Sequence, residues 1–282
     1  MLSDRSMEED IASRRICGLP RLGWGWFALS ALALLFLGGC FQSSQFGSTP
    51  VERNTITVGA ASDLQFAFAE IGTLFEKQTG SKPVFAFGSS GNLASQIENG
   101  APIDVFAAAN AQFVDDLKSK NLIVEDSRRL YAIGRLVLAV KKDAGLDIRS
   151  VEDLARPEVK RIAIANPTHA PYGMAAREVL QNAGLWEQVS SKLVLGENIS
   201  QAVQFVKTGN AEAGLVALSL SNTPEMVYTL IPEDKYQRMN QAMAVVKTSK
   251  NQGAARDFVD FVGSPEAQRI LKKHGFGVPG ET

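Results

Sequence analysis

The sequence predicts an α/β fold of two lobes, each a mostly parallel sheet flanked by helices, with a ligand cleft between the lobes. From residue 56 onward, short apolar runs of strand length alternate with stretches whose apolar residues recur at helical spacing. Two such α/β units follow one another, over 55–135 and 136–241. We expect the closing segment, 242–282, to return to the first unit, so that two chain crossings join the lobes. Ligands of such sheets bind beyond the carboxyl ends of the strands.

In the first lobe, strands and helices are predicted to alternate. Apolar residues between Leu64 and Phe75 recur every three or four positions, which predicts a helix that Gly80 ends. Asn110 is placed to cap a later helix. The expected strands cover 56–59, 84–86 and 103–107, and the expected helices include 64–75, 93–97 and 113–117.

The second lobe and the closing segment continue the alternation. Asn198 stands before a helix that bears Val203 and Val206, and residues 150–153 resemble a capping box. Pro265 suits the first position of the last helix. The expected strands cover 136–140, 161–165, 193–195, 214–218 and, on the return, 242–246, and a further helix is expected over 172–182.

Residues 1–40 are predicted to be an export signal that ends in a lipidated cysteine. Arg14, Arg15 and Arg21 precede an apolar run at 24–37, which is too short for a comfortable bilayer span. The ending at 37–40 resembles a bacterial lipoprotein signal, in which Cys40 would be lipidated and become the first mature residue. Residues 41–54 are polar and turn-rich, which predicts a flexible tether.

Three questions about this leader stay open. It could instead be a plain transmembrane anchor, or a cleaved signal with a chance cysteine. Export could follow the Sec route or the twin-arginine route. Arg14 and Arg15 suggest the twin-arginine route, but the residues after Arg15 fit its pattern poorly. Translation could start at Met1 or at Met7.

The composition excludes several classes of function. A formal net charge of −1 gives no electrostatic reason for nucleic acid or a membrane surface as a partner. Cys17 lies in the leader, so Cys40 has no partner for a disulfide within the mature chain. With His169 and His274 as the only histidines, we expect no zinc site.

Two short turns predict a site for a small oxyanion. Ser62 and Asp63 follow the strand at 56–59, and Ser90 follows the strand at 84–86, each at a helix start without Lys or Arg. Helix starts attract anions through unpaired N–H groups and the positive end of the dipole. Helix capping alone is the alternative, although two hydroxyls before Gly91 exceed what a cap needs.

Enzymatic alternatives find little support. A hydrolase would need an activated nucleophile, but the chain has no Gly-x-Ser-x-Gly elbow, and His169 is expected to be a polar loop residue. No P-loop or dinucleotide fingerprint is present. We therefore expect no catalytic residues, no cofactor and no direct metal-ion ligands.

These motifs together resemble the periplasmic molybdate-binding proteins of ABC transporters, which are two-lobed type II solute-binding proteins. The resemblance covers nearly all of 55–278. Its carriers are the segments 56–62, 87–90, 96–106, 166–173, 196–199 and 264–276.

The resemblance implies a set of ligand residues. The oxyanion would be bound by the hydroxyl and N–H of Ser62 and of Ser90, and by the N–H groups of Tyr172 and Ile199, with Asp63 adding its N–H. Ala217 stands where many members carry a ligand-binding tyrosine. Other members use a tyrosine in the Pro-Tyr-Gly turn, which makes Tyr172 the candidate for the missing phenol; a packed loop is the alternative for this turn.

The resemblance also implies a function. The protein would be a monomeric lipoprotein of the periplasm or cell surface, anchored to the membrane, that captures molybdate or tungstate and delivers it to an ABC permease. The alternatives are a receptor for another tetrahedral oxyanion such as sulfate, a small-anion hydrolase, and a sensory or adhesive lipoprotein.

Overall fold

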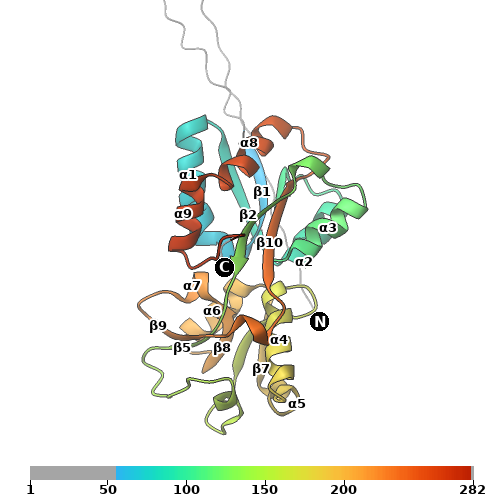
Figure 1. Ribbon diagram of the computed structural model, residues 1–282. Coiled ribbons are helices and arrows are strands. Elements are labelled where there is room, and N and C mark those ends of the chain that lie inside the picture. Colours follow the sequence, from blue (N-terminus) through green and yellow to red (C-terminus); the bar gives the residue numbers. More distant parts are fainter. Residues whose placement is uncertain (1–54, 281–282) are drawn as a thin grey trace, which may run out of the picture. The chain divides into compact units, whose positions relative to one another are not determined.

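Two five-stranded sheets form the centres of two lobes (Figure 1). The computed structural model describes residues 55–280, which belong to one compact unit; the predicted signal, Cys40 and the tether lie outside the described residues. The first sheet consists, in spatial order, of β2 (Lys82–Gly88), β1 (Thr55–Ala61), β3 (Val105–Ala108), β10 (Met239–Val245) and β4 (Arg129–Gly134). The second consists of β7 (Leu193–Gly196), β6 (Ile162–Ala165), β8 (Ala213–Ala217), β5 (Leu136–Lys141) and β9 (Met226–Leu230).

Each sheet has four strands that point the same way and one that runs against them. In the first sheet, β1 pairs in parallel with β2 and β3, whereas β10 is antiparallel to β3 and β4. In the second, β6 pairs in parallel with β7 and β8, whereas β5 is antiparallel to β8 and β9. The predicted fold class is therefore confirmed, with the reversed strand in the fourth position of each sheet.

The chain passes between the lobes twice. β4 ends at Gly134 and β5 begins at Leu136, so Arg135 makes the first crossing. β9 ends at Leu230 and β10 begins at Met239, so residues 231–238 make the second. The returning strand thus begins earlier than the expected 242, and Figure 1 shows it in orange in the same sheet as the blue β1, with β3 between them.

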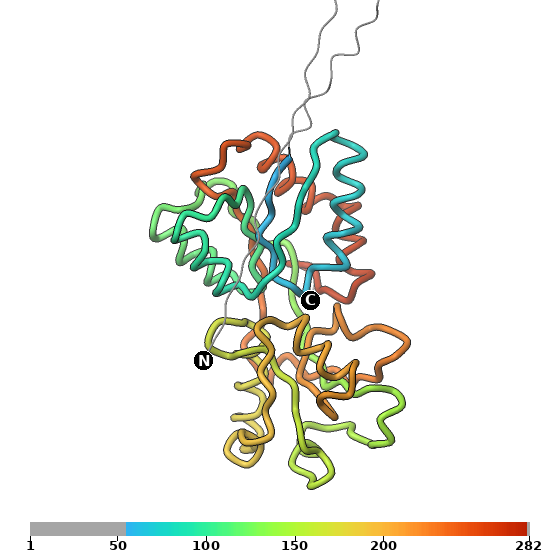
Figure 2. Tube along the Cα trace, turned by 180° about the vertical axis from the view of Figure 1, so that it is seen from behind, coloured from blue at the N-terminus to red at the C-terminus, as the bar shows by residue number. Residues whose placement is uncertain are grey.

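Helices cover both flanks of the sheets. In the first lobe, α1 and α9 lie together on one flank and α2 and α3 on the other, as the opposite views of Figures 1 and 2 agree. The first-lobe helices are α1 (Gln65–Thr79), α2 (Ser90–Glu98), α3 (Ala111–Ser119), α8 (Gln252–Val262) and α9 (Pro265–Lys273). The second-lobe helices are α4 (Pro171–Asn182), α5 (Trp186–Val189), α6 (Ile199–Lys207) and α7 (Leu218–Ser221).

The core of the first lobe joins the two ends of the described chain. Phe68 and Phe75 of α1 are fully buried, and α1 ends where Gly80 adopts a left-handed conformation with φ 75°. Phe258 of α8 meets both rings edge-on, with centroids 5.8 and 5.2 Å away. Each such aromatic pair contributes about 0.5–1.5 kcal/mol beyond the buried area. This packing helps to hold the returning segment in the first lobe.

The predicted helix starts are confirmed at three caps. The side chains of Asn110, Asn198 and Ser264 each accept a hydrogen bond from a backbone N–H in the first turn of α3, α6 and α9. The sequence pattern did not predict β4, and it did not predict β9 either. This strand is an edge strand whose residues after Met226 are exposed, so it carries no apolar alternation.

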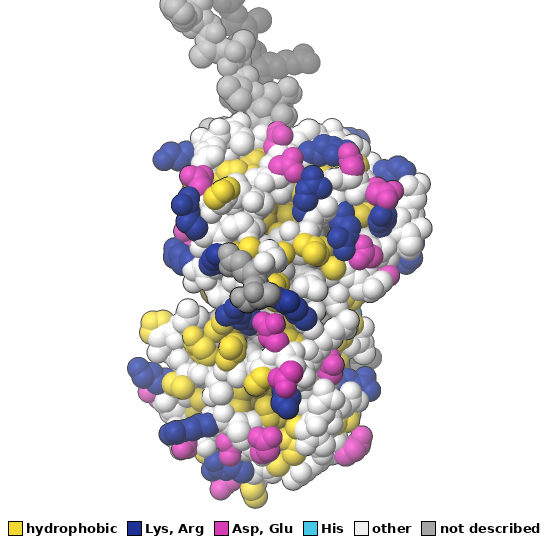
Figure 3. Space-filling model, viewed as in Figure 1, with side chains coloured by type: hydrophobic (Ala, Val, Ile, Leu, Met, Phe, Trp, Pro, Cys, Tyr) yellow, Lys and Arg dark blue, Asp and Glu magenta, His cyan; other side chains and the backbone are white. Residues whose placement is uncertain are grey.

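The surface of the described residues carries both signs of charge. On the face shown in Figure 3, Lys and Arg side chains are interspersed with Asp and Glu over both lobes. No helix within residues 55–280 is long and apolar enough to cross a membrane.

Candidate functional site

Four helix starts, two from each lobe, meet at a small buried cavity. The starts belong to α2 and to the short 3-10 helix η1 (Ser62–Leu64) in the first lobe, and to α4 and α6 in the second. Its lining comprises Ala61, Ser62, Asp63, Gly88, Ser89, Ser90, Ala109, Ala170, Pro171, Tyr172 and Ile199. The structure therefore brings together all five residues that the sequence singled out for the oxyanion.

The hydroxyls of Ser62 and Ser90 are arranged as donors. Ser90 Oγ accepts the N–H of Ala109 at 3.0 Å, and Ser62 Oγ accepts the N–H of Ser200 at 3.3 Å. A hydroxyl oxygen that already accepts still has its hydrogen to donate. Both serines are buried, which removes water as a competing partner. Each hydroxyl can thus give its hydrogen to a guest in the cavity.

Capping of their own helices does not account for these serines. The residue before η1 is Ala61, and Ser89, at the N-cap of α2, makes no side-chain bond to the first turn. The first N–H groups of a helix have no acceptor within the helix. The N–H groups of Ser90 and Ile199, the first residues of α2 and α6, are of this kind.

The N–H of Tyr172 is the first that α4 offers. Pro171 occupies the first helical position and has no N–H, and the Ala170 side chain cannot cap the helix. In α6, by contrast, the Asn198 side chain caps the helix by accepting a hydrogen bond from the backbone N–H of Gln201. It does not bind the N–H of Ile199. At both second-lobe helix starts that line the cavity, the first N–H therefore has no acceptor within its own helix.

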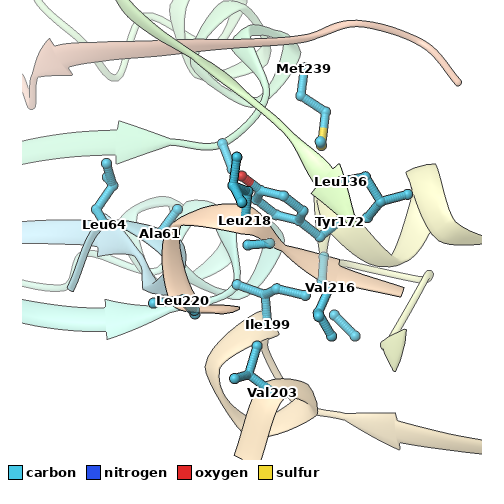
Figure 4. Close-up of a cluster of buried hydrophobic side chains, with 14 of the residues drawn as sticks. Ala61, Leu64, Leu136, Tyr172, Ile199, Val203, Val216, Leu218, Leu220 and Met239 are labelled. Carbon is cyan, nitrogen blue, oxygen red and sulfur yellow. The ribbon is translucent and has the colours of Figure 1, made fainter. Parts of the chain in front are cut away.

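The Tyr172 phenol does not take the place expected for it. Its Oη donates to Asp63 Oδ2 at 3.0 Å, so its one hydrogen is directed to Asp63 and not to a ligand. Figure 4 shows the Tyr172 ring lying among Leu136, Leu218 and Ile199. Burial and the neighbouring Asp63 raise the pKa of the phenol well above its usual value. The donor that Tyr172 has left for a ligand is thus its backbone N–H. Its phenol does not replace the tyrosine that many members of the family carry at the position of Ala217.

Asp63 is the only charged residue in the cavity lining. Burial raises its pKa from 3.8 to about 6, although hydrogen bonds from Gln241 and Tyr172 oppose that rise. Gln241 Nε2 donates to Asp63 Oδ2 at 2.6 Å, and Ser219 Oγ donates to the Asp63 backbone oxygen at 2.9 Å. Within the described residues, no group of three or more His, Cys, Asp and Glu side chains could hold a metal ion.

Further hydrogen bonds cross between the lobes beside the cavity. The N–H of Gly91 donates to the backbone oxygen of His169 at 2.9 Å, and Ser89 Oγ lies 2.8 Å from His169 Nδ1. Ser200 Oγ donates to Gln65 Oε1 at 2.8 Å. The lobes are therefore in direct contact on this side of the cavity, and His169 is a bridging residue.

Sequence reasoning missed four residues of this region. Gln241 is a fully buried polar residue within the apolar strand β10, which was a readable signal. Ser200 and Ser219 gave no sequence signal, because a single serine near a helix start is common. Gly134 leaves room for two side chains that are distant in the sequence. A Cβ there would lie 2.6 Å from Tyr172 Oη and 2.8 Å from Gln241 Nε2.

The arrangement suits a small, fully ionised oxyanion. Its donors are neutral, and a hydrogen bond from such a donor to a charged group contributes about 1.5–3 kcal/mol. A protonated anion would direct its own hydrogen at a donor, so a donor-only shell disfavours it.

Comparison with known proteins agrees with this geometry. Residues 56–277 match the family model described as bacterial extracellular solute-binding protein. The molybdate-binding protein ModA of Azotobacter vinelandii is 38% identical over 233 residues, 79% of this chain and 90% of the relative. A putative ABC transporter substrate-binding lipoprotein, YvgL of Bacillus subtilis, is 31% identical over 255 residues, 89% of this chain and 96% of the relative.

A solved structure is similar in fold and in sequence. The periplasmic molybdate-binding protein of Azotobacter vinelandii superposes with a TM-score of 0.75 at 31% identity, over 79% of this chain and 99% of that chain. This chain belongs to the family of bacterial extracellular solute-binding proteins.

Proposed function

We propose that this protein is an extracytoplasmic binding lipoprotein that captures molybdate or tungstate and delivers it to an ABC permease. The observation that carries the proposal is the cavity at which four helix starts meet, with the hydroxyls of Ser62 and Ser90 and no Lys or Arg in its lining. The names of the relatives, molybdate-binding and ABC transporter substrate-binding, support the choice of ligand and partner.

The anion would be held through its oxygens alone. Ser62 and Ser90 would donate their hydroxyl and backbone hydrogens from the first lobe, with the N–H of Asp63 beside them. Tyr172 and Ile199 would donate their N–H groups from the second lobe. No cofactor and no direct ligand to the metal atom is needed. Because both lobes contribute donors, the bound anion would favour the closed arrangement that the permease receives.

A receptor for sulfate is the nearest alternative. Sulfate and molybdate share charge and tetrahedral shape, so discrimination between them would depend on the size of the closed cavity. Parallel calorimetric titrations of the purified protein with molybdate, tungstate, sulfate and phosphate decide between them. We expect heat with molybdate and tungstate; binding of sulfate or phosphate in their place would overturn the assignment.

A hydrolase has one observation in its favour, the contact between Ser89 Oγ and His169 Nδ1. His169 Nε2 lies 3.9 Å from Glu197 Oε1, beyond hydrogen-bond distance, so no carboxylate orients the ring as a triad requires. We therefore propose a binding protein without catalysis. Turnover of a small ester or phosphate ester that is lost in His169→Ala would contradict this.

The anchor and the assembly state complete the proposal. Cys40 would carry the lipid, and the protein would act as a monomer in the periplasm or at the cell surface. The lipoprotein name of the Bacillus subtilis relative supports the anchor. Replacing Cys40 by Ala should release the mature chain from the membrane fraction, and a chain that stays membrane-bound would speak for an uncleaved anchor.

A further inference from the structure

Asp63 lies at a buried junction to which both lobes contribute. Its Oδ2 accepts two hydrogen bonds, from Tyr172 Oη of α4 at 3.0 Å and from Gln241 Nε2 of β10 at 2.6 Å. Its backbone oxygen accepts from Ser219 Oγ of α7 at 2.9 Å. Asp63 itself follows β1, so the junction joins the first sheet to two helices of the second lobe.

Two buried acceptor atoms in this junction have no donor. They are Asp63 Oδ1 and Gln241 Oε1, whereas Asp63 Oδ2 accepts twice. An ionised carboxylate accepts at both oxygens, and leaving a buried one unpaired is costly. A neutral carboxylic acid has the asymmetry seen here, because one oxygen accepts and the other carries a hydrogen. Since Gln241 donates to one oxygen of Asp63, its own oxygen is the natural acceptor for that hydrogen.

Among the described residues, no positive charge faces Asp63 to stabilise an ionised form. The groups packed against it are the phenols of Tyr172 and Tyr131, the Gln241 amide and the Ser219 hydroxyl. Tyr131, from β4, donates its hydrogen to the backbone oxygen of Ala108, and burial, together with the neighbouring Asp63, raises the pKa of its phenol. An ionised Asp63 would also place a negative charge in the lining of the cavity that we propose binds a dianion.

We propose that Asp63 is a positioning residue that takes up one proton on Oδ1, donated to Gln241 Oε1, when the lobes close on the dianion. The proton comes from solvent and forms an O–H bond; no other bond changes. The inference rests on the proposed function. When the lobes separate, Tyr172 and Ser219 leave with the second lobe, water reaches the carboxyl group, and it ionises again.

The first measurement is calorimetric. The purified protein is titrated with micromolar molybdate and with tungstate from pH 5 to 8, in buffers of different ionisation enthalpy, which gives the affinity and the number of protons taken up. A pKa of about 6 in the closed form, against an ordinary 3.8 in the open form, predicts about tenfold tighter binding at pH 5 than at pH 8. Proton uptake should rise as the pH falls from 8 to 5.

Asp63→Asn is the informative variant. Its amide can donate to Gln241 Oε1 as the protonated acid would, and it never carries a negative charge. It should bind more tightly than the wild type at pH 8, and its affinity should be flat with pH and free of linked protons. Asp257→Asn, which makes the same change at an exposed site on α8, should keep the wild-type profile. Protonation of the anion itself is common to all three proteins and cancels in the comparison.

The outcomes separate the inference from the proposed function. Heat with no proton uptake, or equal pH slopes in the wild type and Asp63→Asn, would overturn the inference while leaving the receptor intact. Absence of heat with every anion would overturn the proposed function. Because the inference concerns closure on the dianion, that outcome would overturn the inference as well.

Discussion

The two halves of the proposed oxyanion site are built differently. The first lobe supplies side chains: two buried serine hydroxyls and a carboxyl group whose pKa is raised to about 6. The second lobe supplies backbone N–H groups at Tyr172 and Ile199, next to apolar packing. A side-chain donor can be removed by substitution, whereas a backbone donor persists under any residue except proline. Function should therefore be sensitive to residue identity in the first lobe and tolerant of it in the second.

The largest effect is expected at the only charged residue of the lining. A folded-state pKa of about 6 for Asp63 against 3.8 unfolded means that the folded protein binds more protons between these values. Its contribution to the free energy of unfolding is therefore greatest below pH 4 and decreases as the pH rises through 4–6. Above pH 6, this contribution is about 3 kcal/mol smaller than below pH 4. Urea unfolding of the wild type and Asp63→Asn, both saturated with molybdate so that the lobes are closed, measures this difference from pH 5 to 8. A constant difference would show that Asp63 ionises normally in the fold.

The next effect concerns the hydroxyls. Ser90→Ala should lose about 2 kcal/mol of anion binding, about 30-fold in Kd, because a hydrogen bond to a charged group disappears. Ile199→Val keeps the N–H and should change Kd far less. Ser95→Ala, on an exposed face of the same helix, is the matched control. Equal losses in Ser90→Ala and Ile199→Val would break the distinction between the two halves.

A steric change at the seam between the halves should be somewhat milder. In Gly91→Ala, the new Cβ would lie 2.6 Å from the backbone oxygen of His169, so the lobes could not close fully. Overpacking of this kind costs about 1–3 kcal/mol, and we expect about a tenfold weaker Kd with little change in the unfolding temperature of the anion-free protein. Gly253→Ala, where nothing lies within 4 Å of the new Cβ, should match the wild type. Unchanged affinity in Gly91→Ala would mean that binding does not need this contact.

The smallest effect is expected at the bridging histidine. His169→Ala removes the contact with Ser89 but keeps the backbone oxygen that Gly91 uses, so Kd should weaken only about threefold. The chain's other histidine provides the control, since His274 contacts Glu70 within the first lobe. Stopped-flow release of the anion should show the loss as faster dissociation in His169→Ala alone. A loss of more than a hundredfold would place His169 in the binding shell.

The difference between the halves also explains what the sequence revealed. Ser62 and Ser90 were readable because hydroxyls at helix starts after short strands are a chemical pattern. Tyr172 and Ile199 could be named only through the family resemblance, because their side chains do not carry the donor. Tyr172 was assigned a phenol facing the anion, but its hydrogen goes to Asp63, a partner 109 positions away in the chain.

The sequence by itself determined the order of most strands and helices, three of the caps, and the apolar faces that form two α/β units. These follow from local periodicity and from residues that favour helix ends, so neighbours along the chain suffice to predict them. The tertiary structure decided which polar groups meet at the cavity, that Gln241 and Ser219 share the Asp63 junction, and that Gly134 leaves room for it. Burial and hydrogen-bond partners are properties of packing between distant segments, and they set the pKa of Asp63 as no local pattern could.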